Sequence, residues 1–94
     1  MAYSMKDMGQ DPAYARFLGA TVGEDMRETK VTVMSMLARL DIDPWLEAAK
    51  LAAMPGSSAR RRLDAVIARF TDVETPASGR GKVVSGLLDL LPKT

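Results

Sequence analysis

The sequence of 94 residues contains neither cysteine nor histidine. Without cysteine there can be no disulfide, no thiolate metal ligand and no cysteine nucleophile. Without histidine the chain lacks the side chain that most often acts as a general base or binds a metal ion. We therefore expect a protein that is not an enzyme and that holds no metal ion or other cofactor.

Long apolar segments are also missing. No stretch approaches the roughly 18 apolar residues that a membrane-spanning helix needs. The N-terminal sequence MAYSMKDMGQ lacks the apolar run of a signal peptide. The expectation from these features is a cytoplasmic protein that does not interact with a membrane.

Apolar residues make up 47% of the chain and charged residues 27%, which is ordinary for a folded domain. A chain of this length forms one domain with a small core. The net charge is +1, but residues 1–54 carry six basic and eight acidic side chains, whereas residues 55–94 carry seven and four. The second half is therefore the better candidate for binding an anion, although the imbalance is far smaller than in dedicated nucleic-acid-binding proteins.

Hydrophobic spacing and capping signals predict an all-α fold, a small irregular bundle of four main helices plus a short N-terminal helix. Residues 1–10 show no periodicity, so we expect a flexible tail followed by a single helical domain over residues 11–94. Asp11 as N-cap, Pro12 at the first helical position and Gly19 as a stop bracket the short helix.

The four main helices are predicted where apolar residues recur on one face, over residues 22–40, 44–54, 58–70 and 82–91. Asp43 and Pro44 supply the start signal of the second of these helices. Ser57 or Ser58 is expected to cap the third. The turn-forming segment 71–81 is expected to be a mobile loop before the fourth.

The predicted core consists of apolar residues from the inward faces of these helices: Phe17, Met26, Val33, Leu37, Leu40, Trp45, Leu46, Ala49, Leu63, Val66, Ile67, Phe70, Val84, Leu87, Leu88 and Leu91. Val31 and Met34 fall outside the apolar face of helix 22–40. They are either isolated exposed residues or a second contact face for a partner. The β-branched run from Val31 to Val33 leaves a strand as an alternative there.

The candidate anion-binding or partner-binding residues are hydroxyl and basic side chains in the second half of the chain: Ser57, Ser58, Arg60, Arg61, Arg62, Arg69, Arg80 and Lys82. Three of these arginines are consecutive and are expected in the first turn of helix 58–70, where the positive end of the helix dipole disfavours them. A bound phosphate or carboxylate would offset that cost. The alternative is a solvated face, in which Arg60 pairs with Asp64 one turn later.

Helix 44–54, the turn and helix 58–70 together have the outline of a DNA-binding helix-turn-helix, with the arginines in the recognition position. Pro55, the length of the turn, the lack of Asn or Gln in the second helix and the nearly neutral charge depart from that pattern. We therefore favour a small non-catalytic helical module that contacts a macromolecular partner, either another protein or a second copy of the chain. Helix-turn-helix-like DNA binding through helix 58–70 is the alternative.

Two short motifs add no chemistry. The segment SGRGK at residues 78–82 lacks the first glycine of a P-loop, and Val83 stands where Ser or Thr would bind magnesium. Asp41 and Asp43 form a DxD pair, which helix capping explains. No nucleophile motif organises the serines, lysines or carboxylates, in keeping with a non-catalytic protein.

Overall fold

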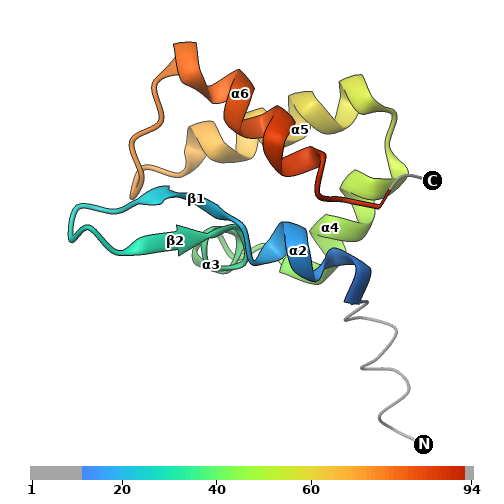
Figure 1. Ribbon diagram of the computed structural model, residues 1–94, viewed down its shortest axis with the longest axis horizontal. Coiled ribbons are helices and arrows are strands. Elements are labelled where there is room, and N and C mark those ends of the chain that lie inside the picture. Colours follow the sequence, from blue (N-terminus) through green and yellow to red (C-terminus); the bar gives the residue numbers. More distant parts are fainter. Residues whose placement is uncertain (1–11, 93–94) are drawn as a thin grey trace, which may run out of the picture.

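The computed structural model describes residues 12–92. Within that range the chain is mostly helical and also contains a small two-stranded antiparallel sheet (Figure 1). The predicted helical character is confirmed, but the all-α assignment is wrong because of the sheet. The predicted flexible tail over residues 1–10 lies outside the described residues. None of the described helices is long and apolar enough to cross a membrane.

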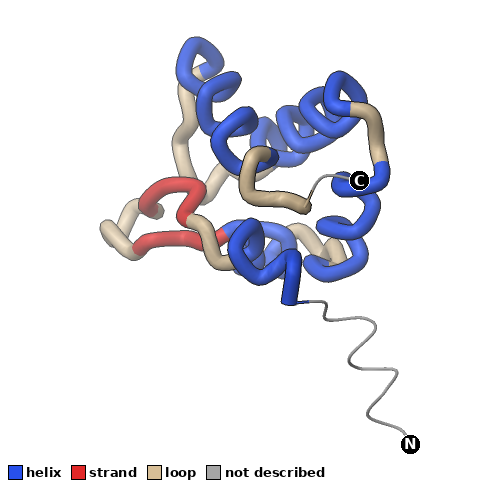
Figure 2. Tube along the Cα trace, turned by 45° about the vertical axis from the view of Figure 1, so that its right-hand side comes forward, coloured by secondary structure: helices blue, strands red, loops and turns tan. Residues whose placement is uncertain are grey.

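The described part of the chain begins with a 3₁₀ turn, followed by two short helices with the sheet between them: η1 (Pro12–Tyr14), α2 (Ala15–Leu18), β1 (Thr21–Glu24), β2 (Lys30–Thr32) and α3 (Val33–Arg39). Three longer helices follow: α4 (Pro44–Ala53), α5 (Gly56–Arg69) and α6 (Ala77–Leu88). Figures 1 and 2 show α5 and α6 side by side as one layer, above a second layer formed by the hairpin, α2, α3 and α4.

The hairpin replaces the first half of the predicted helix 22–40. Its strands pair Thr21 with Thr32 and Glu24 with Lys30, with an irregularity after Thr21. The turn is held by Asp25, whose carboxylate accepts hydrogen bonds from the backbone N–H groups of Arg27 (2.9 Å) and Thr29 (3.0 Å). Such local bonding by Asp competes with helix formation and favours a turn.

The hairpin also corrects two predicted roles. Val31 is only 1% exposed, so it belongs to the core and not to a second contact face. Met26 was expected in the core, but it lies in the hairpin turn and is 96% exposed. Both errors arise because this segment is a hairpin and does not follow helical spacing: Val31 lies in β2, where alternate side chains point to opposite sides, and Met26 lies in the turn between the strands. Met34 is 36% exposed and remains a surface residue whose contact role stays a prediction.

The predicted apolar face of α5 is confirmed, since Leu63, Val66, Ile67 and Phe70 are all buried. On α4 the outcome is mixed. Leu46 was expected in the core but is 53% exposed, and its neighbour Glu47 is buried instead. An ion pair made by Glu47, described below, explains this rotation of the helix.

Helix α6 begins at Ala77, five residues earlier than predicted, and absorbs the glycine-containing part of the expected loop 71–81. Pro76 lies at its N-cap, and the Pro76 carbonyl accepts hydrogen bonds from the N–H groups of Gly79 and Arg80, both at 3.0 Å. A proline preorganises a helix start, which offsets the low helix propensity of glycine that follows.

Gly23 in β1 lies against the segment that joins α5 to α6. Its φ is 157°, and a Cβ built on it would come within 2.6 Å of Cγ1 of Val73. No real Cβ tolerates that approach, so this position requires glycine while the buried Val73 stays in place. The contact fastens the hairpin to the upper layer.

We therefore predict that Gly23→Ala lowers the free energy of unfolding by about 1–3 kcal/mol, because the added methyl forces Val73 or the strand to move. Urea unfolding followed by circular dichroism measures the change. The matched control is Gly86→Ala on α6, where a Cβ meets nothing within 4 Å. This control is expected to raise stability by up to about 1 kcal/mol. Equal effects of the two substitutions would contradict the close approach.

Candidate functional site

Helix α5 starts earlier than expected, and this moves its three consecutive arginines away from the positive end of the helix dipole. Its N-cap is Pro55, which makes no side-chain cap, so the prediction that Ser57 or Ser58 caps the helix is wrong. With Gly56 as the first helical residue, the three consecutive arginines begin at the fifth position, in the second turn. The unfavourable effect of the helix dipole falls off within the first turn. The electrostatic cost that suggested a bound anion is therefore largely absent.

The central interaction of the site joins α5 to α4. Arg62 donates hydrogen bonds to both carboxylate oxygens of Glu47, from Nε at 2.5 Å and from a terminal nitrogen at 2.8 Å. The Glu47 side chain is 2% exposed and that of Arg62 is 42% exposed. Two parallel bonds of this kind satisfy the buried carboxylate and fix the guanidinium in one orientation.

This contact also shifts a protonation equilibrium. The hydrogen bond to Glu47, and then the negative charge of Glu47, raise the pKa of Arg62 above the ordinary arginine value, against a smaller opposing effect of burial. Because this pKa is raised, the contact between protonated Arg62 and Glu47 contributes its full stabilisation at pH values below the ordinary arginine pKa. It is lost only as the pH rises through the raised value.

The predicted pair between Arg60 and Asp64 does not form. Asp64 instead accepts a hydrogen bond from Nε of Arg80 at 2.8 Å, which links α5 to α6. Arg80 was expected in a mobile loop but lies in α6 with this structural partner. Lys82 is also in α6, exposed, and makes no ion pair within residues 12–92.

Four of the predicted residues do come together, along one side of α5. A concave surface of about 470 Å³, here called the α4/α5 hollow, is lined by Ile42, Met54, Ser58, Arg61, Arg62, Ala65, Val66 and Arg69. Five of the six α5 residues that line it fall within a stripe about 100° wide at helical spacing, here called the arginine stripe: Ser58, Arg61, Arg62, Ala65 and Arg69. Arg61 and Arg69 make no ion pair with any residue between 12 and 92.

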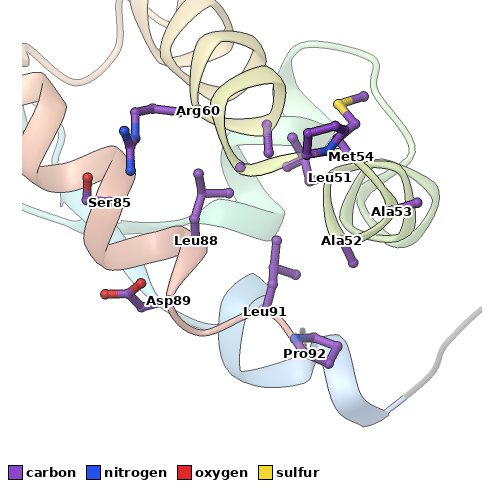
Figure 3. A pocket seen from close by; sticks show the side chains of 13 residues that line it. Leu51, Ala52, Ala53, Met54, Arg60, Ser85, Leu88, Asp89, Leu91 and Pro92 are labelled. Carbon is purple, nitrogen blue, oxygen red and sulfur yellow. The ribbon is translucent and has the colours of Figure 1, made fainter. Parts of the chain in front are cut away.

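Arg60 points to a different place. It lines a second concave surface of about 520 Å³ between the end of α4, the start of α5 and the end of α6. Figure 3 shows the Arg60 guanidinium and Ser85 toward one end of this pocket, while Leu88 and Leu91 extend into it. The eight predicted residues therefore do not form one cluster, and Arg60 is separate from Arg61 and Arg62. Ser57 lines neither surface.

Sequence reasoning missed Glu47 as part of the site. Glu47 and Lys50 are the only charged residues of α4, whose other side chains are apolar. That isolation was the available signal, because a carboxylate surrounded by apolar positions is buried only with a compensating cation. Which cation it meets was not visible, since Arg62 lies 15 residues away in sequence.

Among the described residues, no three His, Cys, Asp or Glu side chains gather closely enough to hold a metal ion. Comparison of the chain with models of protein families, with curated proteins and with solved structures gives no significant match.

We predict that Arg62→Ala lowers the free energy of unfolding by about 2–3 kcal/mol, because it leaves the Glu47 carboxylate buried without a partner. Arg61→Ala removes the same side chain from the neighbouring position, where the structure gives it no ion pair, and should change stability by less than about 0.5 kcal/mol. Thermal and urea unfolding of both variants provide the comparison. A similar loss of unfolding free energy in the two variants would show that the ion pair between Arg62 and Glu47 contributes little to stability.

Proposed function

We propose that the protein is a small non-catalytic binding module that contacts a macromolecular partner, another protein, through the arginine stripe of α5. One observation carries the proposal. Two guanidinium groups on this stripe, those of Arg61 and Arg69, have no ion-pair partner within residues 12–92, and both arginines line a hollow that is also lined by apolar side chains. Arginine beside apolar surface is characteristic of protein contact sites.

The arginines of the stripe have two roles: one stabilises the fold, and two are proposed to contact the partner. Glu47 compensates the positive charge of Arg62 and uses its Nε–H and one terminal N–H group. Arg61 and Arg69 make no ion pair with any side chain in the described part of the chain. The surface therefore offers two free positive charges with forked hydrogen-bonding geometry, which matches carboxylates well.

A protein partner is favoured over duplex DNA for two reasons. The hollow is lined in part by the apolar side chains of Ile42, Met54 and Val66, which would find no apolar partner in a phosphate backbone. Two uncompensated charges also supply far less counterion release than the six to ten phosphate contacts of typical DNA-binding proteins. DNA binding through α5 thus remains the alternative that a titration must address.

We predict that a glutamate-rich helical peptide without apolar anchors shifts the amide NMR signals of Ser58 to Arg69 in the labelled full chain at low salt. The double variant Arg61→Ala/Arg69→Ala should weaken this binding about tenfold or more, since each lost charged hydrogen bond contributes on the order of 1–3 kcal/mol. Moderate salt should weaken binding in both proteins, because the contact is partly exposed.

The matched control is Arg60→Ala/Lys82→Ala, which removes the same net charge from exposed positions outside the hollow. It should leave the peptide affinity nearly unchanged. A duplex DNA of similar charge is titrated in parallel. Stronger shifts with DNA would assign the stripe to nucleic acid, and no shifts with either probe would remove it as a binding surface.

A further inference from the structure

We propose that the arginine stripe binds an acidic amphipathic helix, which seats one bulky apolar side chain in the α4/α5 hollow above Ala65. Carboxylates on either side of that anchor would pair with Arg61 and Arg69. This inference rests on the proposed function and specifies the chemistry of the partner.

The order of residues along α5 supports this arrangement. Arg61, Ala65 and Arg69 follow one another at four-residue spacing, so all three lie on one side of the helix. The side chain between the two arginines is a single methyl group, which leaves space where a longer side chain would fill the surface. The Cα atoms of Arg61 and Arg69 are about 12 Å apart along the helix axis, and Ala65 lies midway between them.

The hollow has the chemistry of an apolar anchor site. Ile42 comes from the connection before α4, Met54 from the end of α4, and Val66 from α5 itself. Arg62 stands at the edge with its orientation fixed by Glu47, so one side of the hollow is held in place before a partner arrives. Preorganised surfaces of this kind lose less entropy on binding.

A helix matches the spacing of the two arginines. Glutamates eight positions apart in a helical segment are also separated by about 12 Å, and a leucine midway lies on the same side, which gives the pattern Glu-x₃-Leu-x₃-Glu. An extended segment could span the same distance. It would, however, find no open sheet edge on α5 for its backbone hydrogen bonds, whereas a helix satisfies its own backbone groups.

A second copy of this chain is the competing occupant. The hairpin turn carries Met26, 96% exposed, between Glu24 and Glu28. The same turn also carries Arg27, which would face the arginines of the stripe. Charge complementarity is therefore poorer than for an acidic helix, and self-association serves as an outcome of the test.

The experiment compares three synthetic helical peptides of equal length by calorimetry and amide NMR titration on the full chain. The first carries Glu-x₃-Leu-x₃-Glu, the second has serine in place of the leucine, and the third has glutamines in place of the glutamates. We expect the leucine to increase affinity about tenfold to a hundredfold over serine, which is the effect of burying one such side chain. Loss of either the leucine or the glutamates should weaken binding.

Two protein variants locate the anchor. Ala65→Leu fills the hollow and should reduce the affinity of the leucine peptide at least tenfold, while the affinity of the serine peptide stays nearly unchanged. Ala68→Leu places the same side chain on another exposed alanine of α5 outside the hollow and should have little effect. Leucine is a strong helix former, so both variants should fold, and circular dichroism verifies this.

The outcomes separate this inference from the proposed function. If Arg61→Ala/Arg69→Ala weakens binding but leucine and serine peptides bind equally, the stripe is a binding surface and the anchored helix is wrong. If no peptide binds, both fail. If the chain associates with itself in the absence of peptide, and Met26→Ser abolishes this association, the hollow is assigned to a second copy and the inference is overturned. Tighter binding of duplex DNA that is insensitive to Ala65→Leu would also overturn it.

Discussion

The ion pair between Glu47 and Arg62 is the contact on which the candidate site depends. Glu47 is buried within the lower layer, and a carboxylate in that position is stable only with a compensating cation. Arg62 provides two hydrogen bonds from the neighbouring helix, and no buried side-chain N or O atom among the described residues is left without a partner. The pair therefore sets how α4 faces α5. It turns Leu46 outward and places a fixed guanidinium at the edge of the hollow.

Other contacts hold the two layers around this pair. Arg39, at the end of α3, donates a hydrogen bond to Asp72 at 3.1 Å and lies 6.0 Å from the centre of the Phe70 ring, so the segment after α5 is tied to the lower layer. Gly23 of the hairpin permits the close approach of Val73 in the same segment. The C-terminal end of α5 is thus attached through α3 and β1, while Arg62 attaches its middle. A helix held at both places presents a stable surface.

The arginines of the second half of the chain fall into three groups that differ in their contacts, although the sequence does not distinguish them. Arg62 and Arg80 are structural, since each holds a carboxylate on a neighbouring helix. Arg60 lines the separate pocket near the end of α6. Arg61 and Arg69 make no ion pair within residues 12–92 and lie beside apolar side chains, which is the basis of the proposed binding role. Once the two structural arginines and the separate Arg60 are set aside, two of the five arginines remain at the α4/α5 hollow.

The sequence by itself determined the features that arise from neighbouring residues. Asp43 caps α4 by accepting hydrogen bonds from the N–H groups of Trp45 and Leu46, as its position before Pro44 predicted, and the buried face of α5 follows helical spacing. Helical spacing could not predict the hairpin, for which only the β-branched run from Val31 to Val33 gave a strand signal. Val22, Met26 and Val33 happen to match a helical face, but in the folded chain Val22 and Val31 are buried in the core and Met26 is exposed in the turn. The partners of Arg62 and Arg80 were decided by tertiary structure too, because each pair joins different helices across 15 or 16 positions. Capping and helical spacing act within a few residues, whereas strand pairing, ion pairs and the hollow depend on how distant segments pack.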